Sequence, residues 1–115
     1  MQSNIYGKKS EIIASQYLKE KGFKILELNH KNKIGEIDII AQDKDYLVFV
    51  EVKARLSRAF GDPFEAVNYK KQQKIRKVAE LYLIMKRKTN TNCRFDVISI
   101  LGHENPEINH IENAF

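Results

Sequence analysis

The chain has one cysteine, no long apolar run and no internal repeat, and each absence excludes a class of protein. Cys93 has no second cysteine to pair with, which fits a reducing compartment. No stretch is long enough to cross a membrane, and the N-terminal MQSNIYGKKS lacks the apolar run of a signal peptide. No repeat of about 20 residues or more and no zinc-type set of Cys and His occurs. We therefore expect a cytoplasmic protein without membrane contact.

The length and the charge distribution favour one domain with a basic segment. A chain of 115 residues suits a single domain, 1–115, with one hydrophobic core. Residues 53–94 hold twelve Lys or Arg against three acids, a local charge of +9 that leaves −4 for the remainder. A basic segment beside an acidic pocket suits an enzyme that acts on phosphodiesters, and a solvated basic helix is the alternative.

The most informative stretch is 35–55, GEIDIIAQDKDYLVFVEVKAR. It predicts two mostly apolar strands joined by a tight turn at Lys44 and Asp45. Charged residues interrupt both strands, although charges are almost never fully buried unless they are paired or bind a metal. These residues are Glu36, Asp38, Glu51 and Lys53. Their presence in apolar strands is the main functional signal of the sequence.

A two-residue turn fixes which positions face each other across the two strands. Asp38 then lies opposite Glu51, and Glu36 lies opposite Lys53, with which it would form a salt bridge. Facing Cβ atoms lie roughly 5 Å apart, so one face would carry three acids and a lysine. Two carboxylates so close repel each other, which a shared proton, a basic partner or a divalent cation relieves. Mg²⁺, held by one or two carboxylates with water and phosphate, suits this set best.

The spacing of these residues resembles a known active site. Asp38, twelve further residues and then Glu51-Val52-Lys53 look like the D…ExK motif of the PD-(D/E)XK nuclease superfamily, with Ile37 in place of Pro. The chain as a whole is similar to the small YraN-like family of proposed endonucleases, related in fold to archaeal Holliday-junction resolvases. The similarity extends from position 11 to position 115 and is carried by the stretches 35–38, 48–55, 60–63, 66–67 and 113–115.

The resemblance implies Mg²⁺- or Mn²⁺-dependent hydrolysis of a DNA phosphodiester. Asp38 and Glu51 would ligate the metal together with the Val52 carbonyl, and Glu11 would hold a second ion or an ordered water. The metal would polarise the phosphoryl oxygen and lower the pKa of a bound water. Lys53 would orient that water and stabilise the charge that builds on phosphorus.

Residues 1–21 predict a first helix that ends at Gly22. Glu11 lies about 20° from Leu18 around the helix axis, at the edge of the apolar stripe. From the helix alone it is a boundary residue paired with Lys8, whereas the resemblance implies that it completes the metal site. The stripe consists of Ser10, Ile13, Ala14, Tyr17 and Leu18.

The remaining pattern predicts strands over 23–28, 94–101 and 108–111 and a helix over 68–88 that begins at Asn68. The order α-β-β-β-α-β-β gives a mixed sheet of four or five strands between helices, which is also the restriction-endonuclease-like α/β sandwich of the resemblance. In the polar segment 29–33 we expect His30 to be solvated. Asp96 is expected to pair with Arg94 or a helix lysine rather than to act in catalysis.

Basic residues near the acids are candidates for binding nucleic acid. Arg55 and Arg58 lie just beyond the acids, in a loop that Gly61 and Pro63 keep irregular, and two exposed arginines are the alternative. The predicted second helix has an apolar stripe of Ile75, Val78, Ala79, Tyr82 and Met85. Its other face carries Lys70, Lys71, Lys74, Arg76 and Lys77. Lys71-Gln72 matches a pair in the YraN-like family, which makes Lys71 the leading candidate.

Two other functions remain open from the sequence. The domain could bind branched or single-stranded nucleic acid without cutting it, or the charged strand face could be a salt-bridge network at a protein interface. We expect DNA as the partner. Domains of this kind often pair through a sheet edge or a helix to span two strands, which favours a homodimer.

Overall fold

The computed structural model describes residues 2–57, 59 and 67–115, with side chains from residue 8 onward. The elements are α1 (Gln2–Glu20), β1 (Lys24–Lys31), β2 (Glu36–Asp43), β3 (Tyr46–Arg55), α2 (Tyr69–Met85), β4 (Asn92–Leu101) and β5 (Glu107–Ile111). The predicted element order is confirmed. Neither helix, within the described residues, is long and apolar enough to cross a bilayer.

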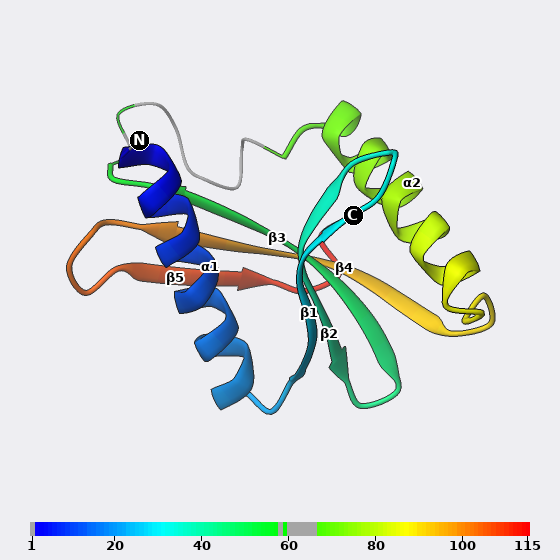
Figure 1. Cartoon of the computed structure of the whole chain (residues 1–115). Coiled ribbons are helices and arrows are strands. Elements are labelled where there is room, and N and C mark those ends of the chain that lie inside the picture. The colour runs from blue at the N-terminus through cyan, green and yellow to red at the C-terminus, as the bar shows by residue number, and fades with distance from the viewer. Residues whose placement is uncertain (1, 58, 60–66) are drawn as a thin grey trace.

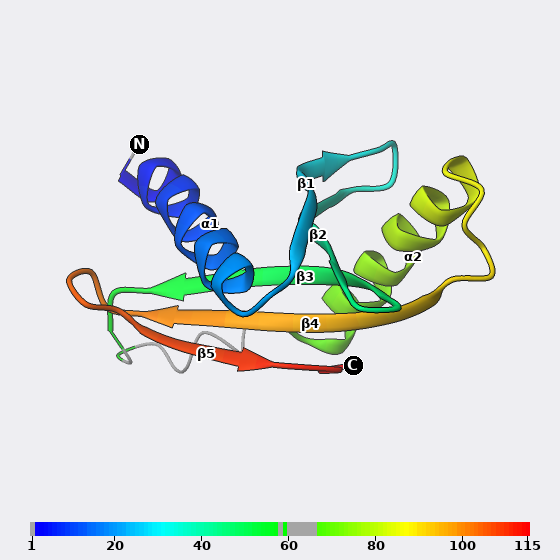
Figure 2. The same cartoon turned by 90° about the horizontal axis from the view of Figure 1, so that it is seen from below.

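The five strands form one mixed sheet in the order β1-β2-β3-β4-β5, in which only β3 and β4 run parallel. The crossover from β3 to β4 contains α2, as a parallel connection requires. Figures 1 and 2 show the two helices on opposite faces of the sheet. The predicted α/β sandwich is therefore confirmed, with β3 at the centre of the sheet.

Two hydrophobic cores join these layers, and β3 contributes to both by alternation. Val48 and Val50 point to the core under α1, whereas Leu47 and Phe49 point to the core under α2. Continuing the alternation places Glu51, Lys53 and Arg55 on the α2 face of the sheet. The charged end of β3 thus projects toward the start of α2.

The β2–β3 hairpin has the predicted register along most of its length. Facing residues run from Asp43–Tyr46 to Ile39–Val50 across a two-residue turn, in which Lys44 has a φ of 56°. Beyond Ile39 the β2 strand leaves β3 but keeps pairing with β1, as far as Lys31 opposite Glu36. Figure 2 shows this end of the β1–β2 hairpin rising away from β3 and β4.

The side-chain alternation of β2 breaks at the same point. Ile37 lies in the core under α2, while Ile39 lies in the core under α1, although positions two apart on a regular strand share a face. The prediction that Glu36 faces Lys53 is therefore wrong, because β2 has already separated from β3. The separation opens the sheet beside Asp38.

The turn between β1 and β2 packs directly against α2. A Cβ atom on Gly35 would lie 3.0 Å from Lys74 Cε and 3.2 Å from Val78 Cγ2, so only glycine fits without a shift. The Asn32 side-chain amide donates to the Val78 carbonyl over 3.2 Å. These contacts fix the height of the helix above the sheet.

β1 is longer than predicted, and His30 is not solvated. Its side chain is only 12% exposed and lies 2.9 Å from Glu27 Oε1. Its ring meets the Tyr82 ring edge-on, with centroids 5.0 Å apart. The polar sequence of 29–33 concealed this packing because the Tyr82 ring comes from α2, which is distant in the sequence.

α2 begins as predicted and ends earlier. The Asn68 side chain accepts a hydrogen bond from Lys71 N over 2.9 Å, which caps the first turn. The helix stops at Met85 because Arg87 adopts a left-handed conformation with φ 56°. The prediction that Met85 packs on the sheet is wrong, since its side chain is 67% exposed at this end.

Candidate active site

The site forms where β2 separates from β3. In a hairpin with a two-residue turn, Ile37 and Val52 would be the next pair to exchange backbone hydrogen bonds. Instead, Val52 N donates to Asp38 Oδ2 over 2.8 Å. The carboxylate thus replaces the lost backbone acceptor. The Val52 carbonyl points to the same side of the strand as its N–H, so it faces the same opening.

Glu51 is the buried acid of the site. Its side chain is 7% exposed and lies beside Asp38. Burial, followed by a hydrogen bond with Asp38 and repulsion from its charge, raises the pKa of Glu51 to about 8. At neutral pH and without a cation, Glu51 therefore holds a proton.

Two lysines reach Glu51 from different elements. Lys71 Nζ on α2 lies 3.7 Å from Glu51 Oε1, and Lys53 Nζ on β3 lies 4.0 Å from the same oxygen. Burial, together with contact with Lys71, lowers the pKa of Lys53. Burial acts in the same sense on Lys71, but its hydrogen bond with Lys53 and the charge of Glu51 outweigh this effect and raise its pKa. The sequence did not predict that Lys71 contacts an acid.

Glu11 approaches this group from α1. Burial and the charge of Asp38 raise the pKa of Glu11, while a hydrogen bond with Asn29 opposes the shift. The contact with Asn29, which belongs to β1, was not predicted from the sequence. Glu36 adds a smaller repulsion to Glu11 and is itself exposed. The expected salt bridge between Glu36 and Lys53 is wrong, since Lys53 pairs with Glu51 instead.

The donor set fits a hard divalent cation that is only partly enclosed by protein. Asp38 and Glu51 offer adjacent carboxylates, and the Val52 carbonyl faces the same opening. Among residues 2–57, 59 and 67–115, no group of three or more His, Cys, Asp or Glu could hold a metal ion. Two carboxylates with room for water and phosphate match the binding mode of Mg²⁺. The repulsion that raises the pKa of Glu51 is the stress that a dication would relieve.

The other basic candidates lie around this group. Arg55 follows Lys53 on the same face of β3, Lys70 is exposed in the first turn of α2, and the Lys74 stem lies over Gly35. Arg58 lies outside the described residues, as do 60–66. Arg76, predicted on the same basic helix face, stacks on an aromatic ring. Its guanidinium carbon lies 4.9 Å from the Phe95 ring centroid.

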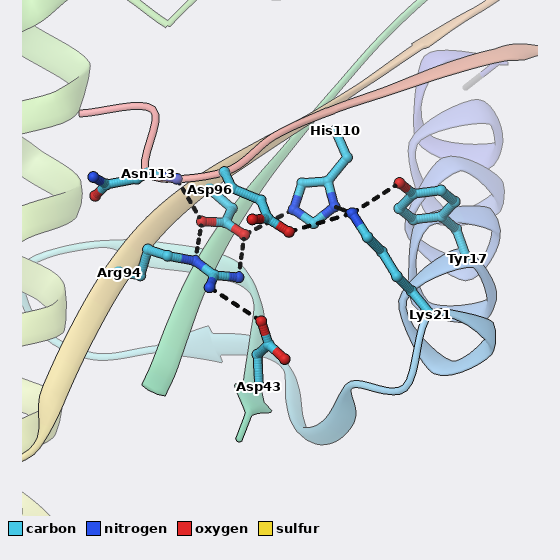
Figure 3. A network of polar contacts seen from close by, with 8 residues as sticks. Tyr17, Lys21, Asp43, Arg94, Asp96, His110 and Asn113 are labelled. Carbon is cyan, nitrogen blue, oxygen red and sulfur yellow. Dashed lines mark hydrogen bonds and ion pairs between the residues drawn. The ribbon is translucent and has the colours of Figure 1, made fainter. Parts of the chain in front are cut away.

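A second buried carboxylate, Asp96 on β4, is separate from the site. Its pairing with Arg94 is confirmed, with Arg94 Nε 2.9 Å from Asp96 Oδ1. Figure 3 shows that His110 and the backbone of Asn113 also converge on it. Lys21, directly after α1, reaches His110 from the other side over 3.1 Å. The sequence did not reveal the partners from the C-terminal segment.

Comparison with other sequences places this arrangement in a known family. Residues 10–100 match the sequence profile of the Uncharacterised protein family UPF0102. The chain belongs to this family. A UPF0102 protein of Alkaliphilus oremlandii is 54% identical over 108 residues, which cover 91% of this chain and 92% of the relative.

Two further relatives are also UPF0102 proteins. The protein of Caldanaerobacter subterraneus subsp. tengcongensis is 51% identical over 115 residues, covering 95% of this chain and 93% of the relative. The protein of Thermodesulfovibrio yellowstonii is 52% identical over 109 residues, covering 95% and 94%. The UPF0102 names state no reaction, so chemistry has to be argued from the geometry of the site.

Proposed function

We propose that the protein is a metal-dependent endonuclease that hydrolyses DNA phosphodiester bonds. The observation that carries this proposal is the convergence of Asp38, Glu51 and Lys53 at the point where β2 leaves β3. Two carboxylates and an amine in one opening are the groups that phosphodiester hydrolysis uses. Their order in the chain resembles the PD-(D/E)XK motif, which supports the same chemistry.

Each residue has a role that follows from its position. Asp38 and Glu51 would hold Mg²⁺ or Mn²⁺, with the Val52 carbonyl as a third oxygen. When bound, the cation polarises the phosphate and makes an adjacent water more acidic. Lys53 is held by Glu51 at the edge of the opening, where its ammonium orients the attacking water and stabilises negative charge on the phosphate. Glu11 would position a water or a second ion from the α1 side.

The surrounding lysines and arginines support nucleic acid as the substrate. Arg55, Lys70, Lys71 and Lys74 lie on β3 and α2 next to the opening. Positive charge there attracts the phosphate backbone and gives binding that weakens with salt. We further propose that the DNA is branched or otherwise structured and that a homodimer spans its two strands. The protein would act in the cytoplasm.

The test is cleavage of defined DNA substrates by the purified chain. Supercoiled plasmid, duplex, single strand and a four-way junction are incubated with Mg²⁺ or Mn²⁺, and separately with chelator. We expect metal-dependent cleavage by the wild type. Asp38→Asn keeps the acceptor for Val52 N and removes one charge, and Lys53→Met keeps the stem of the side chain. Each should lower the rate by at least about 100-fold while circular dichroism stays unchanged.

A matched control identifies a contaminating nuclease. Asp45→Asn removes one acid at the other end of the β2–β3 hairpin, about 20 Å along the strands from Asp38. It should cut like the wild type. Cleavage by Asp38→Asn at the wild-type rate would refute the assignment. Tight DNA binding without cleavage would instead indicate a module that binds without cutting, and no binding at low salt would indicate a salt-bridged protein interface.

A further inference from the structure

The Glu51 carboxylate has more cationic partners than a nuclease motif needs. Lys53 belongs to the motif, but the nearer ammonium is that of Lys71 on α2, 3.7 Å from Glu51 Oε1. The Asn68 cap and the packing of Val78 on Gly35 both fix α2, so Lys71 is held over the acid by the fold. A side chain meant only to grip phosphate would have its ammonium in solvent, as Lys70 does.

We propose that Lys71 is a positioning residue that competes with the divalent cation for Glu51 and, once displaced, binds the phosphate backbone. This proposal rests on the proposed metal site and goes beyond it. Without metal, the ammonium of Lys71 neutralises the carboxyl pair formed by Asp38 and Glu51. When a cation binds, Lys71 loses its partner and is repelled toward the opening, where the DNA backbone would lie.

The direction of the effect on metal affinity follows from charge alone. A dication adds positive charge to the site whether it meets two carboxylates or displaces a proton from Glu51. Lys71 lies close enough to disfavour that change in both cases. Removing the charge of Lys71 should therefore tighten metal binding, whatever the protonation state of Glu51.

The same geometry couples metal to DNA. In the metal-free chain Lys71 is engaged with Glu51, so DNA meets one cation fewer than it does in the metal-bound chain. Metal should therefore strengthen DNA binding, and by linkage DNA should strengthen metal binding by the same factor. A lysine that only bound phosphate would add affinity without coupling. A lysine that only stabilised the fold would change neither metal affinity nor coupling.

The experiment compares Lys71→Met with Lys19→Met, which removes the same charge from an exposed position in the last turn of α1. Mn²⁺ alone is titrated at constant pH and followed by the electron paramagnetic resonance signal of the free ion. We expect Lys71→Met to bind Mn²⁺ at least about fivefold tighter than the wild type. Lys19→Met should change this affinity by less than about twofold. Thermal melts of both variants establish that they are folded.

A second measurement tests the coupling. Anisotropy of a labelled duplex gives its affinity with and without Ca²⁺, which takes the same oxygen ligands as Mg²⁺. The wild type and Lys19→Met should bind duplex at least about fivefold tighter with Ca²⁺, and Lys71→Met should keep only the part of this gain that comes from the cation itself.

The outcomes separate this proposal from the proposed function. Equal or weaker Mn²⁺ binding by a folded Lys71→Met overturns the role of Lys71 and leaves the nuclease proposal standing. Coupling that survives undiminished in Lys71→Met overturns it as well. A wild type that binds no Mn²⁺ overturns both proposals, because the acids then do not form a metal site.

Discussion

The two buried carboxylate clusters of this protein are opposites. Asp96 is 0% exposed and accepts four hydrogen bonds, two from Arg94 and one each from His110 and Asn113 N. Glu51 is nearly as buried, but its nearest polar group is another acid, and its lysines lie at 3.7 and 4.0 Å. The close partners of the Asp96 carboxylate are hydrogen-bond donors, whereas Glu51 lies beside a second acid that repels its charge.

The difference appears in the pKa values and indicates the two roles. Burial alone would raise the pKa of Asp96, but the hydrogen bonds from His110, Arg94 and Asn113 outweigh it and hold the pKa below its usual value. At Glu51 burial and Asp38 act together, and the pKa rises to about 8. A buried acid whose partners lower its pKa stabilises a fold, whereas one whose pKa is raised by burial and a second acid is typical of a functional site.

The largest expected effect on stability comes from removing the Asp96 carboxylate. Asp96→Ala leaves Arg94 and His110 without their acceptor in the interior, so the free energy of unfolding should fall by about 3–5 kcal/mol at pH 7. Urea denaturation measures this loss. Because the pKa of Asp96 is lowered in the folded state, its contribution is present above the unfolded value of about 4 and is lost as the pH falls further.

Asp43→Ala is the matched control for this change. Asp43 contacts the same arginine over 3.1 Å but is partly exposed. Its removal should cost roughly 1 kcal/mol or less, because water can solvate the freed group. Equal losses for the two variants would show that the buried partners do not depend on Asp96.

The second prediction concerns pH and Glu51. Between about pH 4.5 and 8 the folded, metal-free chain holds a proton that the unfolded chain has lost. Its free energy of unfolding should therefore fall as the pH rises, with a slope of up to about 1.4 kcal/mol per pH unit from this group. Glu51→Gln lacks the charge, so its stability advantage over the wild type should grow from pH 5 to pH 8 in chelator.

The control for this prediction is Glu104→Gln, which removes an exposed acid between β4 and β5. Its stability should follow the wild type at every pH. If Glu51→Gln also ran parallel to the wild type, Glu51 would ionise normally in the fold, and the contrast with Asp96 would disappear.

The smallest expected effect concerns the exposed Lys70 and the salt dependence of DNA binding. Lys70 is exposed beside the site, so Lys70→Ala should reduce the slope of log affinity against log salt for duplex DNA by about 1. Lys19→Ala, which removes an exposed charge from the last turn of α1, should leave the slope unchanged. Affinity measured at several salt concentrations distinguishes the two. Equal slopes for both variants and the wild type would exclude Lys70 from the DNA contact.

Local patterns predicted much of this architecture. A two-residue turn at Lys44 and Asp45 fixed the β2–β3 register correctly as far as Ile39 and Val50. Asp96 and Arg94 share a face of β4 at a spacing of two, so their pairing was also predictable. These successes share one cause, namely that the partners are close in the sequence or fixed by strand geometry.

The failures have the opposite cause. The separation of β2 from β3 at Asp38 depends on β1 and α2, which hold the far end of β2. No pattern within residues 35–55 indicates this separation, so the prediction that Glu36 faces Lys53 was wrong. The contact between Lys71 and Glu51, and that between His110 and Asp96, likewise join segments that only the tertiary fold brings together.

Gly35 connects the turn of the β1–β2 hairpin to the chemistry that we propose. A methyl group there would lie 3.0 Å from Lys74 Cε and 3.2 Å from Val78 Cγ2, so side chains of the helix that carries Lys71 would have to give way. The sizes of the side chains at positions 35 and 78 are therefore linked, because both lie between the β1–β2 turn and α2. A relative with a side chain at the first position would need a smaller one at the second to keep its lysine within reach of the carboxyl pair.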